Sequence, residues 1–174
     1  MQQTAKQPNT RLIATVALLA ALALILSYIE AIIPLNLGFP GIKIGFANIV
    51  VVLALYYLGP RYAFYINVIR IALAALLFGT LFSGLYALAG GLCSFAVMAA
   101  LKKTDRFSIT GVSMAGGAVH NIAQLAVAAV IVKTPQIALY LPVLLLAGAA
   151  AGIFNGIISN LVMRKLKYDQ RRSA

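Results

Sequence analysis

Arg70 lies near the middle of the apolar stretch YINVIRIALAALLFG, where a charged side chain is costly and usually functional. Asn67 precedes it by one helical turn, on the same face of the expected helix. The pair predicts a polar strip along one side of that helix, in which the guanidinium can hold an anionic group. The alternative is a structural arginine, paired with backbone carbonyls or with an acid.

A second polar group is centred on His120, in GGAVHNIAQLA. Asn121 adjoins the histidine and Gln124 follows one turn later, so His120 and Gln124 share a helical face. Three polar residues within two turns of an apolar segment indicate the lining of a cavity. The alternative is a histidine that bridges two helices through a hydrogen bond. The nearby sequence contains no second histidine, cysteine or acid, so we expect no metal site.

Three more candidates flank the segment IPLNLGFPG, whose prolines and glycines exclude a regular helix. Glu30 ends the apolar run before this segment, and Lys43 and Asn48 follow it in PGIKIGFANI. Glu30 is the expected partner of Lys43 or Arg70. We predict that Glu30, Lys43 and Asn48 frame an entrance, with Arg70 and His120 further inside, for an organic ligand with anionic groups. The alternative for Glu30 and Lys43 is a pair of simple interfacial charges.

The scarcity of acids limits the chemistry, because the chain has only Glu30, Asp105 and Asp169. Enzymes that hold a diphosphate through Mg²⁺ need clustered carboxylates, and acid–base pairs and nucleophilic triads also need acids in one place. We therefore expect no catalytic residue and no cofactor. An embedded enzyme with His120 as its base is the weakest alternative. The single cysteine, Cys93, excludes an intramolecular disulfide and is expected to be a buried packing residue.

The elements that must position these residues are predicted to be membrane-spanning helices. Of the 174 residues 63% are hydrophobic and 10% are charged, and the mean hydropathy is +0.98. A water-soluble domain cannot bury so much apolar surface, so we predict an all-α multi-pass membrane protein. The apolar runs predict a six-transmembrane-helix bundle, with short second and third spans, at 12–33, 43–58, 62–79, 82–101, 108–132 and 138–163. The domain organisation is then a cytoplasmic N-terminal segment, one membrane domain and a basic cytoplasmic tail, at 1–11, 12–163 and 164–174.

The net charge of +11 is distributed in a way that predicts the orientation in the membrane. If the N-terminus is inside, the outer segments hold only Lys43 and Lys133, Arg70 lies within a span, and all other cations are cytoplasmic. Cytoplasmic loops carry the excess of Lys and Arg, so we predict an N-in/C-in topology. Because topology accounts for the charge, we expect no nucleic-acid partner. Recognition of lipid headgroups by the basic loops is the alternative.

Small residues recur at helical spacing in the first and last spans, and such ridges let helices approach closely in lipid. They are Ala14, Ala17 and Ala21 in the first span and Gly148, Gly152 and Gly156 in the last. We expect the glycine ridge to pack within the chain. The alanine ridge, beside the cytoplasmic N-terminus, is equally suited to an intermolecular contact.

Read in order, the motifs ALLAAL, IEAIIP, PGIKIGFANI, LFGTLFSGLYALAGG, GVSMAGGAVHNIAQ, YLPVLLLAG and the final GxxxG resemble a known family. It is the Gx transporter family, often labelled heptaprenyl diphosphate synthase component I, and the resemblance covers residues 11–166. The family is similar to the substrate-binding S components of energy-coupling factor (ECF) transporters. These are six-helix membrane proteins with a substrate site near the outer face, which dock through an alanine surface on the first helix onto a scaffold subunit driven by two ATPases.

The resemblance implies a substrate-binding subunit of an ECF-type transporter in a bacterial cell membrane. Its substrate would be a small anionic or amphipathic molecule related to a cofactor, such as a flavin or a quinone or isoprenoid precursor. Ala17 and Ala21 match the docking surface, and the chain has no P-loop, so ATP dependence would come from partners. The aspartate-rich motif of prenyl synthases is absent. The alternative is a non-catalytic membrane scaffold for an isoprenoid synthase, acting through the KKTDR loop and the basic tail.

Overall fold

The computed structural model describes residues 10–33, 45–133 and 135–172, and in these parts of the chain the regular structure is all helical. The elements are α1 (Thr10–Ile32), α2 (Phe46–Tyr57), α3 (Pro60–Phe78), α4 (Leu81–Lys103), α5 (Ile109–Val132), the 3₁₀ helix η1 (Pro135–Tyr140) and α6 (Leu141–Arg172). Five of the helical segments are long and apolar enough to cross a membrane. The prediction of an all-α, multi-pass membrane bundle is therefore confirmed. Lys43 lies outside the described residues, and its role stays a prediction.

The second helix, α2, is too short to cross a membrane by itself. It has 12 residues. At 1.5 Å per residue this is about 18 Å, against a hydrocarbon core of about 30 Å. The sequence placed this span at 43–58, but the helix begins only after Gly45, whose φ of 73° is a left-handed conformation that glycine adopts without strain. The third span was also predicted to be short, but α3 has 19 residues and qualifies as a full crossing.

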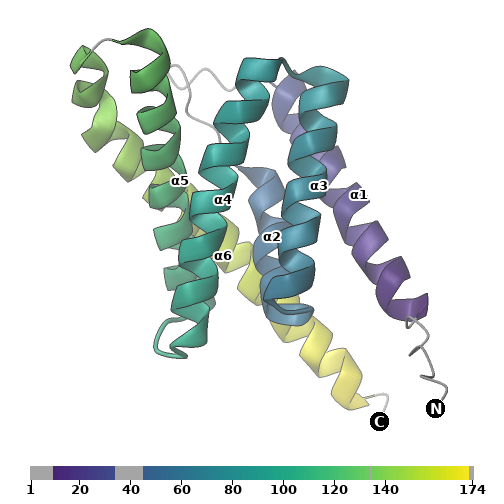
Figure 1. Cartoon of the computed structure of the whole chain (residues 1–174). Coiled ribbons are helices and arrows are strands. Elements are labelled where there is room, and N and C mark those ends of the chain that lie inside the picture. Colours follow the sequence, from purple (N-terminus) through teal and green to yellow (C-terminus); the bar gives the residue numbers. More distant parts are fainter. Residues whose placement is uncertain (1–9, 34–44, 134, 173–174) are drawn as a thin grey trace, which may run out of the picture.

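The long helices surround α2, which packs against α1, α3 and α6. Figure 1 shows α2 in the half of the bundle nearer the two chain ends, which lie at the same end of the molecule. The α2–α3 and α4–α5 connections lie at that end too, with Arg61 at the start of α3 and Arg106 in the α4–α5 connection. This arrangement agrees with a topology in which both termini are on one side of the membrane, and the charge distribution predicts that this side is the cytoplasm.

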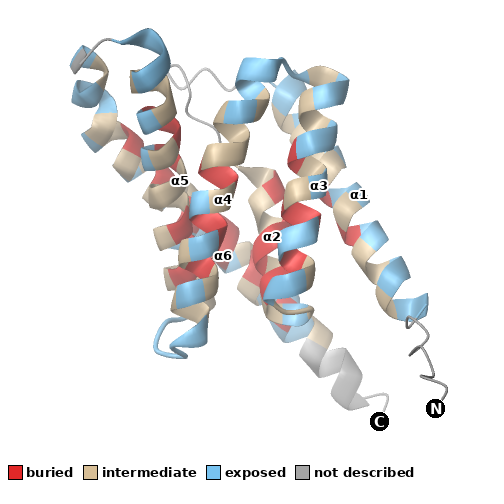
Figure 2. Ribbon diagram, in the orientation of Figure 1, coloured by how far each residue is buried: buried red, intermediate tan, exposed pale blue. Residues whose placement is uncertain are grey.

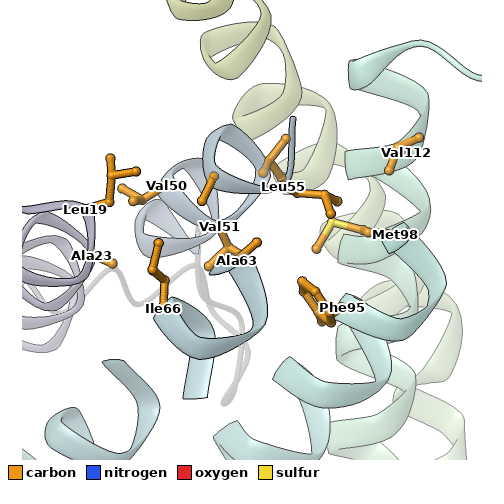
Figure 3. Close-up of a cluster of buried hydrophobic side chains, with 12 residues drawn as sticks. Leu19, Ala23, Val50, Val51, Leu55, Ala63, Ile66, Phe95, Met98 and Val112 are labelled. Atoms are coloured by element: carbon orange, nitrogen blue, oxygen red, sulfur yellow. The ribbon is translucent and has the colours of Figure 1, made fainter. Parts of the chain in front are cut away.

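The hydrophobic core is built around α2, and Figure 2 shows the buried residues gathered where α2 meets the other helices. Along α2, Val50, Val51, Val52 and Leu55 are each at most 2% exposed, so the helix is covered on all sides. Figure 3 shows the residues that pack around them from α1, α3, α4 and α5. These include Leu19, Ala23, Ala63, Ile66, Phe95, Met98 and Val112. The middle of α2 is therefore held by packing from α1, α3, α4 and α5.

The first helix, α1, is the least buried of the spans. Only Leu19 and Ala23 are buried along its 23 residues. The predicted docking residues Ala14, Ala17 and Ala21 are all exposed. The alanine ridge therefore faces away from the bundle, and it faces either lipid or another protein chain.

The glycine ridge of α6 packs within the chain, as predicted, against α5. A Cβ atom added at Gly148 would lie 2.5 Å from the carbonyl oxygen of Gly117, and one at Gly156 would lie 2.6 Å from Cα of Thr110. Gly152 is equally close to the backbone of Ser113. The two helices thus touch backbone to backbone, which only glycine permits.

Two smaller expectations need correction. Helix α6 does not end near residue 163 but continues into the basic segment as far as Arg172, because Arg, Lys and Leu are good helix formers and the segment contains no glycine or proline. Cys93 is exposed on the outside of α4 rather than buried. The buried residues of α4 are instead Gly90, Gly91, Ser94, Phe95 and Met98.

Candidate functional site

Arg70 of α3 lies at the centre of a polar cluster inside the bundle. Its Nη2 donates hydrogen bonds to Oδ1 of Asn48, at 2.8 Å, and to Oδ1 of Asn67, at 3.0 Å. Asn67 is 1% exposed and donates in turn to the carbonyl oxygen of Gly91 on α4, at 3.0 Å. The structure thus brings together Asn48 of α2 with Asn67 and Arg70 of α3. The Nε–H of Arg70 is buried and has no acceptor among the described residues.

Glu30 joins the same region from the end of α1. Its Oε1 accepts a short hydrogen bond, 2.5 Å, from the backbone N–H of Gly45, the residue before α2 begins. A carboxylate at a helix N-terminus is stabilised by the unpaired N–H groups and by the helix dipole. Glu30 therefore links α1 to the start of α2.

Helix α6 holds the start of α2 from the other side. Nδ2 of Asn155 donates to the carbonyl oxygen of Gly45, at 3.1 Å, and Oγ of Ser159 donates to that of Ile49, at 3.1 Å. Both side chains are buried. Sequence reasoning missed these two residues. Their signal was a pair of polar residues four positions apart in an apolar run, which places them on one helical face.

His120 and Gln124 face α4, where the absence of a side chain at Gly90 makes room for them. A Cβ atom at Gly90 would lie 2.9 Å from Nε2 of His120 and 2.9 Å from Cγ of Gln124. Asn121 points elsewhere and donates to the carbonyl oxygen of Leu144 on α6, at 2.7 Å. The structure therefore separates Asn121, which joins two helices, from the other two polar residues.

Adjacent glycines on α4 connect the two polar groups of the site. Gly90 meets His120 and Gln124 of α5, and the position of a Cβ at Gly91 lies 3.5 Å from Nδ2 of Asn67 on α3. The backbone of α4 at Gly90 and Gly91 therefore lies next to both the arginine group and the histidine group. Sequence reasoning did not single out this Gly-Gly pair, although it stands in the quoted motif LYALAGG.

The described part of the site offers hydrogen-bonding and charged groups, and it does not resemble a metal centre. No group of three His, Cys, Asp or Glu residues comes together within the described ranges. The groups present are one guanidinium, one carboxylate, one imidazole and several amides, from Arg70, Glu30, His120, Asn48 and Gln124. Such a set can orient a polar, charged organic molecule.

Comparison with known proteins identifies the family. The model of the heptaprenyl diphosphate synthase component I family matches residues 19–162. The chain belongs to this family. The match begins in α1 and ends in α6, so α2 to α5 and every described residue of the polar cluster lie within the matched region. No curated protein and no solved structure shows significant similarity to the chain.

Proposed function

We propose that this chain is the substrate-binding membrane subunit of an ECF-type transporter, and that it has no catalytic activity of its own. The observation that supports this most strongly is the environment of Arg70. Two amide oxygens fix its guanidinium inside a membrane bundle, and its buried Nε–H has no acceptor among the described residues. A purely structural arginine in an apolar setting would satisfy its donors, since an unsatisfied buried donor costs about 1–3 kcal/mol. A ligand with an anionic or carbonyl oxygen supplies the missing acceptor.

The composition of the site favours a small, polar and planar or amphipathic substrate related to a cofactor, of the flavin type or the quinone or isoprenoid precursor type. Amide groups on Asn48, Asn67 and Gln124 provide both donors and acceptors, and the surrounding helices provide apolar walls. Substrate capture from outside and delivery to a bacterial cytoplasm would follow from the N-in/C-in orientation, with the entrance near Glu30 and Lys43.

The exposed alanine face of α1 supports a partner of the scaffold type. Ala14, Ala17 and Ala21 lie on the least buried helix, and small residues allow a second helix to approach closely in lipid. The energy for transport would come from ATPase subunits bound to that scaffold.

The decisive experiment is to purify the wild-type chain and the variant Arg70→Gln from a native host and to identify bound small molecules by mass spectrometry. Loss of a charge-assisted hydrogen bond, about 1.5–3 kcal/mol, should lower ligand recovery on the order of tenfold or more. Arg61→Gln, which removes an exposed cation from the start of the same helix, is the matched control and should retain the ligand. Equal recovery from wild type and Arg70→Gln would refute the proposal.

A non-catalytic scaffold for an isoprenoid synthase is the second candidate, and the name of the family favours it. Its functional surface would be the exposed cations Lys103 and Arg106 at the α4–α5 connection. Affinity purification separates the two functions. Recovery of scaffold and ATPase subunits supports the transporter, whereas recovery of a soluble prenyl synthase supports the second candidate.

A further inference from the structure

The Glu30 carboxylate occupies a place where an external anion could bind. It accepts a hydrogen bond from the N–H of Gly45, just before α2 begins, and in the first turn of α2 Asn48 accepts a hydrogen bond from Arg70. A helix N-terminus beside a guanidinium is a general anion site, because unpaired N–H groups and positive charge converge there. In this structure the anion in that site is a side chain of the protein itself.

The charges of Glu30 and Arg70 limit how a second anion can bind in this region. Among the described residues Glu30 is the acid at the start of α2, where Gly45 donates to it and Asn48 accepts from Arg70. Asp105 lies in the α4–α5 connection, at the end of the bundle near the chain termini. The described groups of this region therefore include one positive and one negative side chain, Arg70 and Glu30. A substrate oxyanion bound to Arg70 while Glu30 remained charged in place would put two negative groups together in a region of low dielectric, which is strongly unfavourable.

We propose that Glu30 is an exchangeable internal ligand. An oxyanion of the substrate, either carboxylate or phosphate, displaces the Glu30 carboxylate from the start of α2 and becomes the counter-charge of Arg70. This inference rests on the proposed function, because it assigns the substrate an anionic group and gives that group its place. Exchange also breaks the hydrogen bond from Gly45 to Glu30, so substrate binding removes one contact between the start of α2 and the helix that carries the exposed alanine ridge.

The exchange makes a prediction opposite in sign to that for an ordinary binding residue. Glu30→Gln removes the competing negative charge but keeps a side-chain oxygen that accepts from Gly45. The fold should therefore be preserved, while no protein carboxylate competes with the substrate anion for Arg70. Removing one close negative charge should tighten oxyanion binding by about tenfold or more. If Glu30 instead bound the substrate directly, the same substitution would weaken binding.

The test uses the full-length chain in detergent, titrated with sodium pyrophosphate and separately with sodium citrate, at an ionic strength held constant with NaCl. The thermal midpoint reports binding. Pyrophosphate represents the phosphate class of oxyanion and citrate the carboxylate class. Asp105→Asn is the matched control, since it neutralises an acid outside the site. Glu30→Gln should show half-maximal stabilisation at about one tenth of the concentration needed by wild type or Asp105→Asn, and Glu30→Gln/Arg70→Gln should lose the effect.

The outcomes separate this inference from the proposed function. If Glu30→Gln responds to neither anion, or responds no more strongly than wild type, the exchange is wrong, whatever the native ligand is. The proposed function is tested independently, because it depends on whether Arg70→Gln loses the co-purified ligand. If Glu30→Gln does not purify as a monodisperse protein, Glu30→Ala vacates the same site, and the same tightening is required of it.

Discussion

The contact between α5 and α6 yields a sharp prediction about stability. In Gly152→Ala the added Cβ would lie 2.7 Å from Cα of Met114 and closer still to the carbonyl oxygen of Ser113. Carbon atoms in contact normally lie about 3.5–4.0 Å apart, so the two helices must separate by about 1 Å. Both neighbours are backbone atoms, which cannot rotate out of the way as a side chain can.

The expected magnitude is a balance of two opposing terms. Overpacking a close contact typically costs about 1–3 kcal/mol, whereas alanine is favoured over glycine within a helix by about 0.5–1 kcal/mol. The net loss should be about 1–2 kcal/mol, which lowers the thermal midpoint of a chain of this size by about 2–8 °C.

The measurement is thermal unfolding of the detergent-purified protein. The matched control is Gly111→Ala on α5, where the added Cβ would meet only Oγ of Ser108, at 3.4 Å, an ordinary contact. This control should be as stable as wild type or slightly more so, because it gains helix propensity without a clash. If the two variants unfold at the same temperature, the backbones of α5 and α6 are not in direct contact at Gly152.

Two further substitutions test other parts of the molecule. Lys102→Met removes a hydrogen bond of 2.6 Å from the ammonium to the carbonyl oxygen of Leu55 near the end of α2, so it should destabilise the protein by about 1–2 kcal/mol, while Lys103→Met, at an exposed neighbour, should change the thermal midpoint little. Ala17→Leu should leave the thermal midpoint unchanged but prevent co-purification with a scaffold subunit, because a bulky side chain blocks close helix contact. Ala126→Leu, on an exposed face of α5, is its control, and equal recovery of the partner from both variants would exclude the alanine ridge as a docking surface.

Contacts between polar residues of one helix could be predicted from the sequence, whereas contacts between helices could not. Arg70 and Asn67 are one turn apart, and helical periodicity alone places them together. The contact between Arg70 and Asn48 joins two helices, and neither residue predicts it by itself. Asn121 shows the limit of local reasoning, because it adjoins His120 in sequence but hydrogen-bonds to a different helix.

The roles of some glycine residues could also be predicted from the sequence, whereas those of others could not. The GxxxG ridge of α6 was recognisable from its spacing, and its intramolecular packing is confirmed by its closeness to α5. The roles of Gly45 and Gly90 were not recognisable. Gly45 is defined by a left-handed φ and by hydrogen bonds to α1 and α6, and Gly90 by a side chain that approaches from α5. The residues next to Gly45 and Gly90 in the sequence do not predict these contacts with other helices.

The sequence by itself determined that the chain is a helical, multi-pass membrane protein. The length and hydropathy of each apolar segment decide whether it can span the hydrocarbon core of a bilayer, and both are properties of a local stretch of sequence. It also determined the family and the identity of the costly polar residues. Only the tertiary structure decided that α2 is a short central helix, that Glu30 binds the start of that helix, and that Asn155 supports it from α6. These features depend on contacts between helices distant in sequence, where the partner of each polar group is selected by packing and not by spacing along the chain.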